Sequence, residues 1–159
     1  MADIRVLVVD DDPNALDIVR TFLEAKGYEV VTAKDGNEAL GLLEDVRPAL
    51  VLLDVMMPGM DGIEVCRRIK SNPKTHHVPV IMVTALDQAD DRIRGLEAGA
   101  DDFLSKPLDD LALFCRVRSL VRLKMLTDEL RARTVGGEHL GLISDCEHLL
   151  DIGLNGGRP

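Results

Sequence analysis

Short apolar runs of strand length alternate with longer segments of helical periodicity along most of this chain, and this alternation limits the fold more than any other feature. The runs are continuously apolar and rich in β-branched residues, which is typical of strands buried on both faces. Strands that alternate with helices predict βαβ units, in which helices cover both faces of a parallel sheet. The expected strands are residues 4–9, 28–33, 49–54, 78–85 and 101–107.

The segments between these runs carry helix signals. Asp12 followed by Pro13 is typical of a helix N-cap and its first helical position, and Asp35 with Glu38 forms a capping-box pattern. Asp87 is expected to cap the fourth helix. Apolar residues recur at helical spacing and predict one inward face for each helix. These residues are Ala15, Ile18, Val19 and Phe22, then Ala39, Leu42, Leu43 and Val46, then Val65, Cys66 and Ile69, and finally Ala89, Ile93 and Leu96.

The last helix is expected to be long, from about residue 109 to 134, and it is apolar on more than one side. Leu113, Val117 and Leu120 mark one side, whereas Phe114 and Val121 mark another. A helix that only covers a sheet needs a single apolar stripe. The surplus therefore predicts that this helix is also buried against a partner.

Polar residues follow the predicted strands. Asp10 and Asp11 follow the first strand, Asp54 ends the third, Thr84 lies at the end of the fourth and Lys106 at the end of the fifth. In parallel α/β sheets, ligands bind at the edge formed by the carboxyl ends of the strands. Each residue alone fits an ordinary role as a cap, turn residue or solvated lysine. Their shared position at strand ends favours a functional site.

The chemistry of this set is specific. Clustered carboxylates repel one another by roughly 4 kcal/mol per close pair at a surface-like dielectric. Mg²⁺ relieves that repulsion and prefers one or two carboxylates together with water and phosphate oxygens. An ionised Asp54 can then attack phosphorus and become an aspartyl phosphate, while Lys106 and Thr84 contact phosphoryl oxygens.

The segments "VVDDD", "LLDVMMPGMDG", "VTA" and "FLSKP" resemble the receiver domain of two-component response regulators over about residues 3–123. The resemblance implies an α/β, doubly wound, flavodoxin-like fold with five parallel strands in the order 2-1-3-4-5 and an extended C-terminal helix. It also implies a cis Lys106–Pro107 bond and a phosphoacceptor domain at 1–123. The implied site comprises Asp54 as phosphoacceptor, Asp10, Asp11, Asp54 and the backbone carbonyl of Met56 as Mg²⁺ ligands, Thr84 and Lys106 as phosphoryl contacts, and Thr84 with Phe103 as the switch.

The segment "DRIRGLEAGADDFLSKPLDD" and its neighbours resemble, more narrowly, the first receiver of PleD-type diguanylate cyclases. This implies a fragment of such a protein, or its regulatory module, in c-di-GMP signalling with a downstream adaptor or cyclase domain. Residues 124–159 are expected to form a helical stalk extension and a linker tail. "GGEHL" at 136–140 is similar to a cyclase signature, but too few residues follow for a cyclase domain. A Gly-Gly helix stop is favoured, and no enzyme activity is expected.

The receiver resemblance implies a histidine kinase or histidine phosphotransfer protein as phosphoryl donor. It also implies a homodimer through the fourth helix, fifth strand and fifth helix, with Asp101 or Asp102 and Arg116 or Arg118 as candidate cross-dimer ion pairs. Two alternatives stay open: a constitutive interaction module with a vestigial acidic pocket, and a stand-alone single-domain response regulator. An Asp-nucleophile phosphatase is disfavoured, because Met56 occupies the position of its second acid.

Charge and composition exclude other classes. The net charge of −9 argues against direct nucleic-acid binding. No apolar run reaches the length of a membrane span or forms a signal peptide. Cys66, Cys115 and Cys146 are widely spaced, which fits a reduced protein better than a disulfide scaffold. A cytoplasmic protein is therefore expected.

Overall fold

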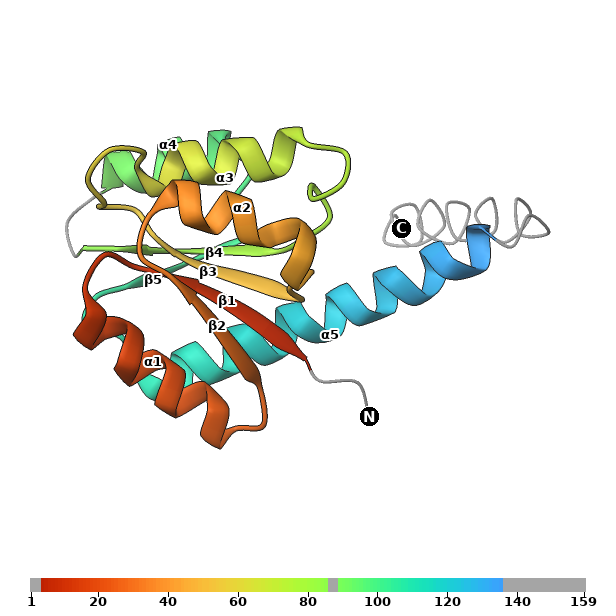
Figure 1. Cartoon of the computed structure of the whole chain (residues 1–159), viewed down its shortest axis with the longest axis horizontal. Helices are drawn as coiled ribbons and strands as arrows, with labels where there is room; N and C mark the ends of the chain where they lie inside the picture. The colour runs from red at the N-terminus through yellow and green to blue at the C-terminus, as the bar shows by residue number, and fades with distance from the viewer. Residues whose placement is uncertain (1–3, 86–88, 136–159) are drawn as a thin grey trace, which may run out of the picture. The chain divides into compact units, whose positions relative to one another are not determined.

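The computed structural model describes residues 4–85 and 89–135 (Figure 1). The predicted cap Asp87 and the segment 136–140 lie outside the described residues. Strands and helices alternate as the sequence predicts. The elements are β1 (Arg5–Val9), α1 (Pro13–Ala25), β2 (Glu29–Ala33), α2 (Gly36–Val46), β3 (Leu50–Asp54), α3 (Gly62–Ser71), β4 (Val80–Thr84), α4 (Ala89–Glu97), β5 (Asp102–Ser105) and α5 (Asp110–Val135).

The five strands form one parallel sheet in the order β2-β1-β3-β4-β5, which confirms the predicted doubly wound fold. The register pairs Asp54 of β3 with Val83 of β4, and Thr84 of β4 with Ser105 of β5. The carboxyl ends of β3, β4 and β5 therefore meet at one edge. This is the edge at which the sequence places its polar residues.

Two hydrophobic cores cover the two faces of the sheet. Helices α2, α3 and α4 lie on one face, and α1 with the first turns of α5 lies on the other (Figure 1). Successive side chains of a strand point to opposite faces, so Leu7 of β1 enters the first core and Val8 enters the second. Every residue of β3 and β4 is buried. The sheet is therefore a fixed support for the residues at its edge.

Helix α4 differs from the sequence prediction. Ile93 and Leu96 were expected to face inward, but their side chains are 55% and 62% exposed. The helix instead buries Asp91 and Gly95. Ile18 of α1 was likewise expected inside, but its side chain is 69% exposed, and the buried residues of α1 are Val19 and Leu23.

Helix α5 buries the stripe Leu113, Val117 and Val121 against the sheet. The prediction placed Val121 on another side of the helix, but it is buried in the same core as Leu113 and Val117. Arg116 of α5 forms an ion pair with Asp102 of β5 at 2.7 Å, within the chain rather than across a dimer. The chain divides into two compact units, residues 1–124 and 125–159. The second unit is described only over residues 125–135, so the predicted stalk and tail stay a prediction.

Among the described residues, no helix is both long enough and apolar enough to cross a membrane.

Candidate functional site

Three carboxylates meet at the carboxyl edge of the sheet. Asp10 follows β1, where its backbone N–H donates to Ala33, and Asp54 is the last residue of β3. One oxygen from each of Asp10, Asp11 and Asp54 lies within 4.8 Å of the others. Asp10 and Asp54 are buried, whereas Asp11 is exposed. The structure thus brings together the three acids that the sequence places at strand ends.

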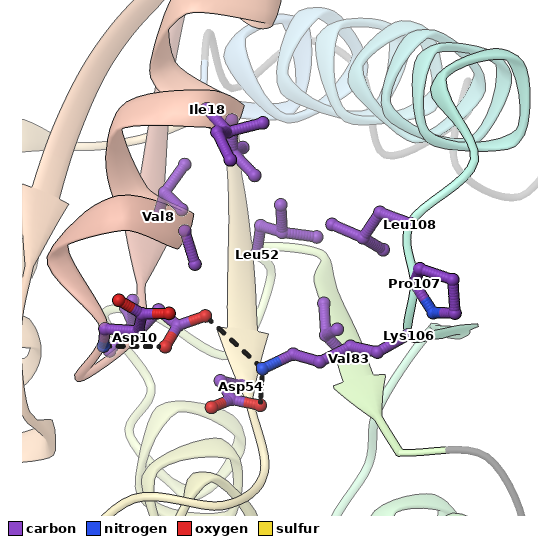
Figure 2. Close-up of a pocket in the computed structure, with 13 residues that line it drawn as sticks. Val8, Asp10, Ile18, Leu52, Asp54, Val83, Lys106, Pro107 and Leu108 are labelled. Atoms are coloured by element: carbon purple, nitrogen blue, oxygen red, sulfur yellow. Dashed lines mark hydrogen bonds and ion pairs between the residues drawn. The ribbon is translucent and has the colours of Figure 1, made fainter.

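Lys106, the residue directly after β5, completes this cluster (Figure 2). Its Nζ lies 3.3 Å from Oδ1 of Asp54 and 3.6 Å from Oδ2 of Asp10. Its backbone N–H donates to the carbonyl of Thr84 at 2.8 Å, which holds the end of β5 beside β4. The bond from Lys106 to Pro107 is cis, as the resemblance implied. Burial alone would lower the pKa of Lys106, but Asp54 and Asp10 together outweigh it and raise the pKa.

The surroundings of Asp54 disfavour its charged form. The pKa of Asp54 is raised from 3.8 to about 6, mainly by burial and then by the charge of Asp10, although Lys106 offsets part of the rise. A pKa of about 6 leaves most Asp54 side chains ionised at neutral pH. Asp54 is therefore a carboxylate nucleophile that one lysine only partly neutralises.

Thr84 lies at the end of β4, one residue beyond the strand partner of Asp54. Its side chain is 1% exposed, and its hydroxyl has no hydrogen-bond partner among the described residues. A buried polar group without a partner costs about 1–3 kcal/mol, so such groups are uncommon in folded proteins. A ligand oxygen at the edge of the sheet would satisfy this hydroxyl.

The loop between β3 and α3 returns tightly onto Asp54. The N–H of Gly62 donates to the carbonyl of Val55 at 2.9 Å, and Asp61 caps α3 by accepting from Glu64. A side chain at Gly62 would overlap the backbone of Asp54. Sequence reasoning identified the turn but missed this contact. Met56 lies in the same loop, and the role of its carbonyl stays a prediction.

Phe103 lies within β5, three residues before Lys106. It pairs with Met82 in the sheet and packs, partly buried, against the core on the α4 side. The two proposed switch residues therefore belong to neighbouring strands, with Thr84 at the edge and Phe103 beneath α4. The predicted switch role of both residues is not tested by this geometry.

A cavity of about 360 Å³ opens beside Asp54, between α1 and the turn that follows β5 (Figure 2). Apolar side chains form most of its wall, and Ile18 of α1, which is 69% exposed, stands beside it. Asp10, Asp54 and Lys106 form its polar end. This cavity could not be predicted from the sequence, since it depends on how α1 packs beside the turn at Pro107 and Leu108.

The side chains at the carboxyl edge fit a hard divalent cation. Asp10, Asp11 and Asp54 offer only oxygen donors, and Mg²⁺ binds through one or two carboxylates while it keeps water and phosphate oxygens. The raised pKa of Asp54 also shows that one further positive charge would be favourable beside it. The three carboxylates and the raised pKa of Asp54 both agree with the predicted metal site.

Comparisons with known proteins agree with this geometry. The family described as "Response regulator receiver domain" matches residues 6–118. Response regulator PleD of Caulobacter vibrioides is 52% identical over 152 residues, which are 96% of this chain and 33% of that protein. The DNA-binding dual master transcriptional regulator RpaA of Synechocystis is 44% identical over 74% of this chain and 49% of its own length. This chain thus spans half or less of either relative.

Among solved structures, a CheY-like response regulator receiver domain protein from Methanospirillum hungatei superposes with a TM-score of 0.74 at 29% identity. The match covers 79% of this chain and 99% of that one.

Proposed function

Because this chain belongs to the response regulator receiver domain family, we propose that it is a signalling module that accepts a phosphoryl group on Asp54 in a Mg²⁺-dependent reaction. The main support for this proposal is that five polar side chains lie together at one edge of the sheet. A buried carboxylate, two further acids, a lysine and a buried hydroxyl converge there from four strands, and within the described part of the chain that hydroxyl has no hydrogen-bond partner. A vestigial pocket would not require all of them.

The transfer follows from the positions of these groups. A carboxylate oxygen of Asp54 forms a bond to phosphorus while the P–N bond of a phosphohistidine donor breaks, and its electron pair leaves with the imidazole nitrogen. Lys106, now paired with Asp54 at 3.3 Å, is placed to pair with a phosphoryl oxygen instead. The hydroxyl of Thr84 donates to another. Bound Mg²⁺ would supply charge neutralisation between the carboxylates and the phosphoryl oxygens.

The proposed donor is a histidine kinase or a histidine phosphotransfer protein. The apolar cavity beside Asp54 and the exposed Ile18 offer an apolar contact next to the reacting carboxylate. A helix that presents phosphohistidine can pack there through an apolar side chain. This contact would hold the phosphorus atom near Asp54. No catalytic base is needed, because the carboxylate of Asp54 is already ionised at neutral pH.

The decisive experiment is intact-mass measurement after incubation with Mg²⁺ and acetyl phosphate. The wild-type protein is expected to gain the mass of one phosphoryl group, and Asp54→Asn is expected to gain none. Asp10 is also buried and lies 3.6 Å from Lys106, but we assign it to the metal site, whereas Asp54 is the proposed nucleophile and lies closer to Lys106, at 3.3 Å. Asp17→Asn removes an exposed acid from α1 and should react like the wild type. Equal phosphorylation of Asp54→Asn would contradict the proposed acceptor.

Metal binding gives a separate prediction. Mg²⁺ at ten times its Kd should stabilise the wild-type protein by about 1.4 kcal/mol, since it binds only the folded site, and this should raise Tm by roughly 5 °C. Asp11→Asn should lose most of this increment, because Asp11 contributes one of the three clustered carboxylates. Differential scanning fluorimetry with and without Mg²⁺ measures it, with Asp17→Asn as the control. An unchanged increment in Asp11→Asn would exclude this ligand assignment.

The proposed output is a homodimer through α4, β5 and α5, in a protein related to PleD-type diguanylate cyclases. The exposed side chains of Ile93 and Leu96 on α4, together with Leu111 on α5, support an interface there. The identity to PleD supports a regulatory role toward an adaptor or cyclase domain in c-di-GMP signalling, in the cytoplasm. Arg116 would join this interface only at the expense of its present pair with Asp102.

A further inference from the structure

Gly95 stands at an unfavourable position for a glycine. It lies within α4, where glycine destabilises a helix by about 1 kcal/mol relative to alanine. It is also buried and faces the sheet, whereas the apolar Ile93 and Leu96 face outward. Glycine at position 95 weakens the helix and contributes no side chain to the core, so its presence is best explained by the packing around it.

The packing reason is the ring of Phe103. A Cβ atom at Gly95 would lie 2.7 Å from Cε1 and 3.0 Å from Cζ of Phe103, and 3.7 Å from Cγ of Met82. Carbon atoms in contact prefer about 3.5–4.0 Å, so the ring edge occupies the space that a side chain on α4 would need. Only a residue without a Cβ lets Phe103 lie in this inward position.

The same two elements are joined a second time near the functional edge. Arg92, three residues before Gly95, donates from its guanidinium to the hydroxyl of Ser105 at 2.6 Å. Ser105 directly precedes Lys106, which pairs with Asp54. The position of α4 on β5 therefore depends on the Phe103 ring at one point and on a hydrogen bond beside the proposed phosphoryl site at another.

We propose that Gly95 is the positioning residue for Phe103: its missing side chain forms the notch in α4 that holds the ring inward, and residue size at 95 sets how α4 rests on β5. The proposal deepens the proposed function and rests on it where it links ring position to Asp54. Gly95 acts through Phe103, since the nearest atoms to a Cβ at this position belong to Phe103 and Met82.

Fluorine NMR tests the ring directly, because the chain has only three phenylalanines. Protein labelled with 4-fluorophenylalanine should give three resonances, of which the Phe103 signal is assigned by its loss in Phe103→Leu. Gly95→Ala should move the Phe103 signal and leave the other two in place. Gly41→Ala is the matched control, since a Cβ at this other helical glycine meets nothing within 4 Å. An unmoved Phe103 signal in Gly95→Ala overturns the proposal.

A double-mutant cycle separates this contact from a general helix effect. In the wild-type background Gly95→Ala should lower Tm, because the new Cβ collides with the ring. Leucine lacks the ring atoms Cε1 and Cζ, so in the Phe103→Leu background the same change should raise Tm through its helix propensity. An equal change of Tm in both backgrounds would show that Gly95 and Phe103 are not coupled.

Beryllofluoride with Mg²⁺, used as a phosphoryl mimic, tests the link to Asp54. It should shift the Phe103 resonance of the wild-type protein, and Gly95→Ala should lose most of that shift while acetyl phosphate still phosphorylates it. If the wild-type protein gains no phosphoryl mass, the proposed function fails but the packing result stands. If it does gain that mass and Gly95→Ala keeps the full shift, the link between Gly95 and the switch is wrong.

Discussion

Asp54→Asn is expected to stabilise the metal-free protein at pH 7.5 by about 3 kcal/mol. The pKa of Asp54 is raised from 3.8 to about 6, first by burial and then by Asp10, and each pH unit of such a difference corresponds to about 1.4 kcal/mol. The folded protein therefore binds this proton more tightly than the unfolded chain, and stability is lost as pH rises from about 4 to about 6. Asparagine has no charge to bury, so it removes this loss.

Urea unfolding in EDTA over a range of pH measures the effect. The gain from Asp54→Asn should be about half as large at pH 5 as at pH 7.5, and it should vanish near pH 3, where the wild-type carboxylate is protonated in both states. Asp17→Asn, on the exposed side of α1, should change stability by less than about 0.5 kcal/mol. A loss of stability in Asp54→Asn at pH 7.5 would mean that the pair with Lys106 outweighs burial.

The stability that is lost by burying the ionised Asp54 is related to the proposed function. A carboxylate that destabilises its own protein remains reactive, because Lys106 at 3.3 Å satisfies it only in part. A cation or a phosphoryl group with its counter-charge removes the imbalance. The same electrostatics that weaken the metal-free protein therefore favour binding at this site.

The sequence predicted the sheet and most of the site because both depend on local patterns. Strand-length apolar runs fix the strands, and a parallel sheet then places Asp10, Asp54 and Lys106 at one edge whatever the details of packing. The strand order and the cis bond at Pro107 came from family resemblance, since an X–Pro bond by itself favours trans. The hydroxyl of Thr84 has no hydrogen-bond partner among residues 4–85 and 89–135, and this depends on side-chain contacts that no sequence spacing encodes.

The wrong predictions concern which side of a helix faces the core. Periodicity predicts an inward apolar face, and this holds for α3, where Val65, Cys66 and Ile69 are buried. It fails for α4, where Ile93 and Leu96 are exposed. The inner side of α4 is instead shaped by its neighbours: Gly95 accommodates the Phe103 ring, and Asp91 forms an ion pair with Arg94 at 3.6 Å. An apolar face that a helix turns to solvent marks a surface for a partner, and the sequence pattern alone cannot distinguish it from core.

Gly62→Ala is expected to destabilise the protein by about 3 kcal/mol or more, since overpacking against rigid atoms is among the costlier substitutions. The new Cβ would overlap the carbonyl oxygen of Asp54 and lie 2.9 Å from the carbonyl carbon of Asp54 and from Cα of Val55. These are backbone atoms at the end of a buried strand, so no side-chain rotation relieves the collision. The loop or the strand end must move.

Urea unfolding compares Gly62→Ala with Gly41→Ala, which places the same methyl group on a helix where nothing lies within 4 Å. Gly41→Ala should leave stability unchanged or raise it by up to about 1 kcal/mol through helix propensity. Phosphorylation by acetyl phosphate adds a second readout, because a displaced Asp54 backbone moves the nucleophile away from Lys106 and slows the transfer. If Gly62→Ala lowers the free energy of unfolding by less than about 1 kcal/mol and leaves the phosphorylation rate unchanged, the loop can move to accommodate the new Cβ. The close return of Gly62 onto Asp54 would then not be what positions the phosphoacceptor.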